Sequence, residues 1–206
     1  MVRDQKSAAA TFPQTAFDVI AVAASAGGLS ALSHVLARLP ADFPAAVLVV
    51  QHLDPRHRSL MADILSRRTP LQVKQAEEGS RLRPATVFIA PPNRHLLVNP
   101  DGTLSLSQSE LVHFVRPSAD LLFESVAASY KQRAIAVVLT GTGSDGSMGV
   151  QAIKKMGGTV IAQDEQTSEF FGMPGAAIHT GVVDFTLPLD EIPHILLTLV
   201  MKGEAE

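Results

Sequence analysis

Three short segments of the sequence are almost continuously apolar, and each ends in a cluster of small or polar residues. They span residues 19–24, 45–51 and 134–139. Short apolar runs that are rich in β-branched residues and bounded by glycine or proline predict strands buried on both faces, as in a parallel sheet. Parallel strands require crossover connections, so the stretches between these runs are expected to hold helices.

Helical spacing of apolar residues supports this expectation. We expect helices near residues 28–39, 57–68, 118–131, 146–156, 174–179 and 190–201, and further strands at 71–75, 86–90, 159–162 and 182–186. The alternation predicts an α/β fold: a doubly wound, mostly parallel, Rossmann-like sheet with helices on both faces and right-handed crossovers. Residues 95–98 and 103–106 flank the turn Pro100-Asp-Gly102 and predict an antiparallel hairpin at the margin of the sheet.

Length and charge narrow the possible classes of protein. The chain has 206 residues, of which 46% are hydrophobic, and this suits one domain with a substantial core. Residues 1–16 show no periodicity, so we expect a flexible N-terminal tail there and one domain over residues 17–202. Lys and Arg number 17 against 20 Asp and Glu, a formal charge of -3, which argues against a nucleic-acid partner.

The uncharged span 19–37 raises the alternative of a membrane segment or signal peptide. It contains several serines and a central glycine pair, and its removal would delete the first strand of the sheet. We therefore expect no membrane insertion and a soluble, cytoplasmic protein. The chain has no cysteine, which excludes disulfides, thiolate catalysis and cysteine-based zinc sites. The spacing of its histidines fits no compact metal motif, so we expect neither a metal nor a cofactor.

Three polar residues follow the three apolar strands. Ser25, His52 and Asp145 stand at or just beyond the strand ends, and in a parallel sheet these ends meet at one edge. A hydroxyl, an imidazole and a carboxylate are the groups that nucleophilic acyl transfer requires. Each has a plainer interpretation, as a turn residue, a buried core histidine and a helix cap. Their joint occurrence at three strand ends favours a shared active site.

Ser25 also lies between a strand and a helix, much as in a nucleophile elbow, although Ala23 replaces the first glycine of that motif. The chain order Ser, His, Asp differs from the order Ser, Asp, His of the α/β-hydrolases. The common lipase-like topology therefore does not account for this sequence.

Further motifs accompany these three residues. They are Ala24-Ser25-Ala-Gly-Gly28, Gln51-His52, Ile89-Ala-Pro91 with His95, Arg116-Pro-Ser118, Leu139-Thr-Gly-Thr-Gly-Ser-Asp145-Gly146, Gln163-Asp164-Glu165 and Phe171-Gly-Met-Pro174. In this order and combination they resemble the catalytic domain of the chemotaxis protein-glutamate methylesterases, the CheB family. The resemblance covers about residues 17–200.

The resemblance implies hydrolysis of glutamyl methyl esters on the cytoplasmic helices of methylated chemoreceptors, with release of methanol, and in addition deamidation of receptor glutamines. It assigns the nucleophile to Ser25, the general base to His52 and the orienting acid to Asp145. Residues expected to donate to the oxyanion or line the site are Ala26, Gly27, Thr142 and Gly143. We expect a substrate groove at Arg94, His95, Arg116 and Met173.

Members of the family usually carry a receiver domain before the catalytic domain, whereas residues 1–16 alone precede the first predicted strand here. We therefore expect a standalone catalytic domain, unless the chain is a fragment. Its activity would be regulated by a separate receiver or regulatory protein, or would not be regulated. Two alternatives stay open: a noncatalytic flavodoxin-like binding or docking module, and a serine esterase for small molecules. The turn at Ser25 lacks both a dinucleotide fingerprint and a P-loop lysine, which argues against a nucleotide-binding module.

Overall fold

The computed structural model describes residue 12 and residues 15–52 and 59–201. Its central sheet has seven strands, all parallel. They are β1 (Val19–Ala24), β2 (Ala46–Gln51), β3 (Gln72–Gln75), β4 (Thr86–Ile89), β7 (Ala134–Val138), β8 (Thr159–Gln163) and β9 (Phe185–Leu187). The strand order is β3-β4-β2-β1-β7-β8-β9, so the first strand lies at the centre.

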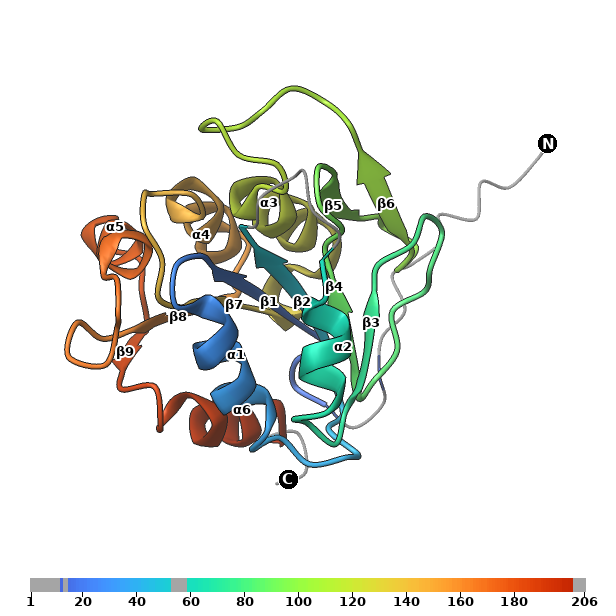
Figure 1. Ribbon diagram of the computed structural model, residues 1–206, viewed down its shortest axis with the longest axis horizontal. Coiled ribbons are helices and arrows are strands. Elements are labelled where there is room, and N and C mark those ends of the chain that lie inside the picture. The colour runs from blue at the N-terminus through green and yellow to red at the C-terminus, as the bar shows by residue number, and fades with distance from the viewer. Residues whose placement is uncertain (1–11, 13–14, 53–58, 202–206) are drawn as a thin grey trace.

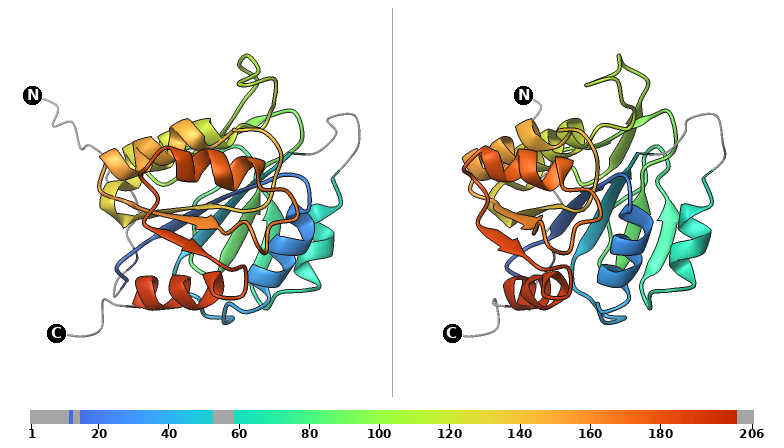
Figure 2. Two further views of the ribbon diagram at one scale, coloured as in Figure 1. Left: turned by 90° about the vertical axis from the view of Figure 1, so that its left-hand side faces the viewer. Right: turned by 60° about the vertical axis from the view of Figure 1, so that its left-hand side comes forward.

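Helices cover both faces of this sheet (Figures 1 and 2). They are α1 (Gly28–Leu36), α2 (Met61–Ser66), α3 (Ala119–Tyr130), α4 (Ser147–Lys155), α5 (Gly172–His179) and α6 (Ile192–Met201), with a 3-10 turn, η1 (Lys131–Arg133). A separate antiparallel pair, β5 (His95–Val98) and β6 (Leu104–Ser107), packs beside α3. The doubly wound fold with a marginal hairpin is confirmed.

Each predicted helix and strand has a counterpart. The largest difference concerns the helix expected at residues 57–68, which is α2 and spans only Met61–Ser66. Positions 57 and 58 of that prediction lie outside the described residues. Among the residues that the structure describes, no helix is long and hydrophobic enough to cross a membrane.

Two apolar cores explain why the central strands are almost entirely apolar. Side chains of a strand alternate between its faces. Accordingly Val19, Ala21 and Ala23 join the core under α3, α4 and α5, whereas Ile20 and Val22 join the core under α1, α2 and α6. Every residue of β1 and β2 is buried. Both faces are covered, so the functional groups of this fold gather at the ends of the strands.

A buried ion pair lies at the amino end of β1. Asp18 is 0% exposed, and both of its carboxylate oxygens accept hydrogen bonds from the guanidinium of Arg133, including one of 2.7 Å from Nη2 to Oδ1. The backbone N–H of Phe12 donates to the same carboxylate at 2.8 Å. Residue 12 of the predicted tail thus contacts the domain, whereas residues 1–11 and 13–14 of that prediction lie outside the described residues.

Replacing Arg133 with alanine should lower the free energy of unfolding by about 3–5 kcal/mol, because it leaves the buried Asp18 carboxylate without its cation. Urea denaturation of the two proteins at pH 7 measures this difference. Lys131→Ala is the matched control, since it removes an exposed positive charge from the same turn. Equal effects of the two substitutions would contradict a specific contribution of the ion pair.

Candidate active site

The parallel register places Ser25 and His52 on neighbouring strands at one edge of the sheet. Ala24 pairs with Gln51, so the next residue of each strand lies at the same level. The backbone N–H of His52 donates to the carbonyl of Ala24 at 3.2 Å, and that of Ser25 donates to the carbonyl of Thr140 at 3.0 Å. The carboxyl ends of β1, β2 and β7 therefore lie together at this edge of the sheet (Figure 1).

The turn that carries Ser25 is short and depends on glycine. Gly27 caps α1 with φ 76°, a left-handed conformation that glycine adopts without strain. The carbonyl of Ser25 accepts hydrogen bonds from the backbone N–H of Gly28 at 2.9 Å and from Nε2 of Gln51 at 2.6 Å. A Cβ at position 28 would lie 2.0 Å from Oε1 of Gln51. The turn thus holds Ser25 at the amino end of α1, where backbone N–H groups favour negative charge.

His52 lies next to a buried carboxylate. Its Nε2 is 2.8 Å from Oδ2 of Asp145, and the two side chains are 14% and 4% exposed. An ionised carboxylate only accepts hydrogen bonds, so Nε2 of His52 carries the proton and Nδ1 carries the lone pair. This is the tautomer that a general base requires.

The carboxylate of Asp145 accepts three further hydrogen bonds at the amino end of α3. Its Oδ1 accepts from Oγ of Ser118 at 2.8 Å and from the backbone N–H of Asp120 at 3.2 Å, and its Oδ2 accepts from the N–H of Ala119 at 2.6 Å. Burial raises the pKa of Asp145, but the hydrogen bonds from His52, Ala119, Ser118 and Asp120 outweigh it and lower the pKa overall. Asp145 is therefore held ionised.

Ser118 was not predicted to belong to the site, although it stands in the Arg-Pro-Ser motif. Serine before an apolar helical pattern is a typical N-cap signal. Here the hydroxyl of Ser118 makes no cap hydrogen bond. The carboxylate of Asp145, which is 27 residues away along the chain, accepts the first N–H groups of α3 instead. Ser118 is fully buried and donates to a carboxylate, so its hydroxyl is not accessible to substrate.

A cleft of about 420 Å³ opens above these groups. Five predicted site residues line it: Ser25, His52, Thr142, Gly143 and Asp145. Gly141 lets the loop after β7 approach the serine, because a Cβ there would lie 2.8 Å from Cβ of Ser25. His113 also lines it, as do Phe114, Val115 and Ser144, to which sequence reasoning assigned no role in the site.

Two of the expected groove residues hold a loop instead. Arg116 donates to Oδ1 of Asn93 from Nε at 2.9 Å and from Nη2 at 2.8 Å, and Nη1 donates to the carbonyls of Gln108 and Ser109 at 3.1 and 2.6 Å. His95 is fully buried, and its Nε2 lies 3.0 Å from the carbonyl oxygen of Glu110. Both side chains fix the segment 108–118 to the body of the domain.

Burial contradicts the groove assignment of two side chains. His95 is 0% and Met173 1% exposed, so neither can form the wall of a groove. Burial also lowers the pKa of His95, which keeps its ring neutral. Arg94 is exposed, and its contact with substrate stays a prediction. Ala26, one of the predicted oxyanion residues, lies in the turn after β1, and its backbone carbonyl accepts a hydrogen bond from Oγ1 of Thr140 at 3.1 Å.

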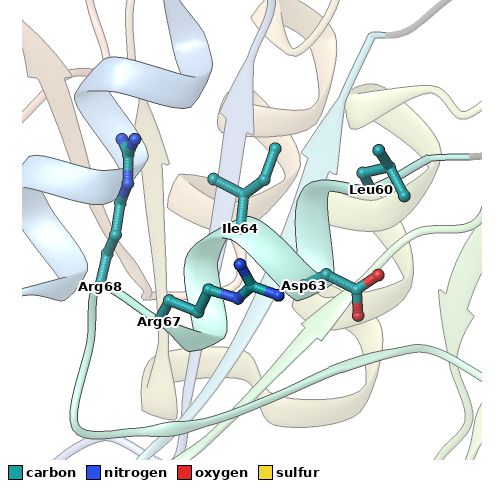
Figure 3. A pocket seen from close by; sticks show the side chains of 5 residues that line it. All are labelled: Leu60, Asp63, Ile64, Arg67 and Arg68. Carbon is teal, nitrogen blue, oxygen red and sulfur yellow. The ribbon is translucent and has the colours of Figure 1, made fainter.

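A second cleft, of about 340 Å³, lies beside α2 (Figure 3). The described residues that line it are Leu60, Asp63, Ile64, Arg67 and Arg68, and none of these five is a serine or a histidine. In Figure 3 the side chain of Arg68 extends toward α1, where Nη1 donates to Oγ of Ser33 at 3.3 Å. The chemical groups for acyl transfer therefore lie in the first cleft.

Comparison with known proteins places this arrangement in a family. The family model described as CheB methylesterase matches residues 20–196. The protein-glutamate methylesterase/protein-glutamine glutaminase 2 of Anaeromyxobacter dehalogenans is 44% identical over 182 residues, which are 88% of this chain and 53% of that protein. The chain thus spans about half the length of that relative. A Leptospira interrogans relative is 38% identical over 183 residues, which are 89% of this chain and 95% of that protein.

A solved structure supports the same assignment. The Thermotoga maritima CheB methylesterase catalytic domain superposes with a TM-score of 0.86 at 38% sequence identity. The match covers 89% of this chain and 99% of that one. Sequence and fold agree over nearly the whole domain, and this chain therefore belongs to the CheB methylesterase family.

Proposed function

We propose that this chain hydrolyses glutamyl methyl esters on chemoreceptors, releasing methanol, and that it deamidates glutamines of the same proteins. The printed names of its relatives, protein-glutamate methylesterase/protein-glutamine glutaminase, support both reactions. The observation that carries the proposal is the hydrogen bond of 2.8 Å between His52 and Asp145 in the cleft that Ser25 also lines.

The chemistry follows from the protonation states of these groups. Oγ of Ser25 attacks the ester carbonyl while Nδ1 of His52 takes the hydroxyl proton. The C–O bond to the methoxy group then breaks, and His52 returns the proton to it, so that methanol leaves. Water, deprotonated by His52, then attacks the glutamyl ester of Ser25. The bond between its carbonyl carbon and Oγ of Ser25 breaks, His52 returns the proton to Oγ, and a glutamate side chain is released. Asp145 orients the imidazole and balances its transient positive charge.

Backbone donors would stabilise the oxyanion of each tetrahedral intermediate. We assign this role to the N–H groups of Ala26 and Gly27 at the amino end of α1, together with the loop at Thr142 and Gly143. The positive end of a helix and preorganised N–H groups both favour the developing charge. The same site can act on glutamine, because an amide presents the same carbonyl and releases ammonia in place of methanol.

The proposed substrate determines where the reaction takes place. The methylated segments of chemoreceptors are cytoplasmic helices, so we place the activity in the cytoplasm. A helix offers its glutamyl side chains on a convex surface, and the cleft above Ser25 is open enough to receive one of them.

The proposal is tested by methanol release from a methylated chemoreceptor cytoplasmic fragment. A serine-directed phosphonate probe, with the labelled peptide identified by mass spectrometry, reports the nucleophile independently. We expect methanol release and labelling at Ser25. Labelling without methanol would show a different acyl substrate, such as a small ester, and the absence of both would favour a noncatalytic binding module.

A further inference from the structure

An exposed phenylalanine stands at the rim of the active-site cleft. Phe114 lines this cleft and is 94% exposed, more than any other large hydrophobic side chain in the described part of the chain. It belongs to the segment 108–118, which projects beyond the body of the domain in Figures 1 and 2. Leu111 of the same segment is 54% exposed and Met148, in the first turn of α4, is 56% exposed. An exposed aromatic side chain at a cleft, with further exposed apolar side chains in its own segment, is typical of a recognition surface.

The backbone at Phe114 has an unfavourable conformation. Val112 and Val115 exchange two backbone hydrogen bonds, of 3.2 and 2.9 Å, and enclose a tight two-residue turn. His113 and Phe114 occupy its central positions with φ values of 48° and 66°. Asparagine and glycine are the usual residues of such turns, because other side chains crowd the backbone in a left-handed conformation. Backbone strain of this kind is concentrated at functional sites.

Several contacts hold the turn in place. Arg116 and His95 bind backbone carbonyls before the turn, as described above, and Nδ1 of His95 accepts a hydrogen bond from the backbone N–H of Ser118 after the turn at 3.1 Å. Nε2 of His113 lies 3.4 Å from Oδ2 of Asp120, whose Oδ1 accepts hydrogen bonds from the backbone N–H groups of Met148 and Gly149 at 3.0 and 2.7 Å. A central residue of the turn and the start of α4 thus both contact one buried carboxylate. The exposed ring of Phe114 is presented by a supported loop.

We propose that Phe114 is a specificity-determining residue, which packs against apolar side chains beside the esterified glutamate of a helical protein substrate. This inference rests on the proposed function: Phe114 would let the enzyme distinguish the methyl ester of a protein from a small ester. A methyl ester offers few atoms for recognition, so the binding energy that selects a protein must come from contacts remote from the reacting carbonyl. The exposed ring lies beside the cleft, where a helix that carries the ester would pass. Aromatic anchors contribute much of the energy at such contacts.

The test compares two substrates with the full chain. The substrates are the methylated receptor fragment, assayed by methanol release, and p-nitrophenyl acetate. For Phe114→Ala we expect KM for the receptor fragment to rise about tenfold, and the ratio of receptor to small-ester kcat/KM to fall about tenfold. Phe114→Leu should recover most of the loss. Met156→Ala is the control, since Met156 is a 38% exposed apolar residue at the far end of α4.

The outcomes separate this inference from the function on which it rests. An unchanged ratio for Phe114→Ala, with methanol released by the wild type, overturns the inference alone. An equal loss on both substrates shows that the loop supports the catalytic groups and also overturns it. Failure of the wild type to release methanol overturns the proposed function, and this inference with it.

Discussion

Replacing Ser25 with alanine should lower kcat/KM for methyl-ester hydrolysis by about 10⁴-fold or more. The variant lacks the oxygen that forms the acyl intermediate, and His52 has no hydroxyl to deprotonate. The turn itself should persist, because it is held by the carbonyl of Ser25 and by Gly27 and Gly28, not by the serine hydroxyl. The measurement is methanol release under single-turnover conditions, with thermal unfolding as a check of the fold.

Two other serines provide matched controls for this substitution. Ser144 lines the same cleft and is exposed, so Ser144→Ala should change the rate by only a small factor. Ser118 is buried and binds Asp145, so Ser118→Ala should reduce the rate moderately through the position of that carboxylate. A wild-type rate for Ser25→Ala, or a comparable loss in Ser144→Ala, would contradict the assignment of the nucleophile.

Replacing Asp145 with asparagine should lower kcat/KM by about 10³- to 10⁴-fold. All four of its partners are donors: Nε2 of His52, Oγ of Ser118 and the N–H groups of Ala119 and Asp120. An asparagine presents an NH₂ group in place of one oxygen, so either His52 and Ala119 or Ser118 and Asp120 lose their acceptor. We also expect the free energy of unfolding at pH 7 to fall by about 1–3 kcal/mol, because buried donors are left unpaired.

The stability difference between wild type and Asp145→Asn should depend on pH. The pKa of Asp145 in the folded chain is below its ordinary value of about 3.9. The ionised carboxylate therefore stabilises the fold above that ordinary pKa, and its contribution disappears as the pH falls through the lowered pKa. Denaturant unfolding between pH 7 and pH 3 should show the two proteins converging toward low pH. A constant difference over this range would contradict the role of the charge.

The segment 108–118 shows where prediction from sequence ended. It has no apolar periodicity, and its position depends on contacts with Asn93 and His95, which lie well before it in the chain. Nothing local indicates that Arg116 would bind backbone carbonyls of its own loop, or that His95 would be buried beneath it. The burial of His95 was therefore not predicted, and Phe114 was not assigned to the cleft.

The sequence by itself determined the order of strands and helices and the three residues at the strand ends, Ser25, His52 and Asp145. Both follow from short-range patterns: continuous apolarity marks strands that are covered on both faces, and parallel strands bring their carboxyl ends to one edge. Only the tertiary structure decided that Ser118 and the amino end of α3 donate hydrogen bonds to Asp145, and that the turn at Phe114 lines the cleft. These features arise from hydrogen bonds between residues far apart in the chain, and such pairings have no periodic signal in a single sequence.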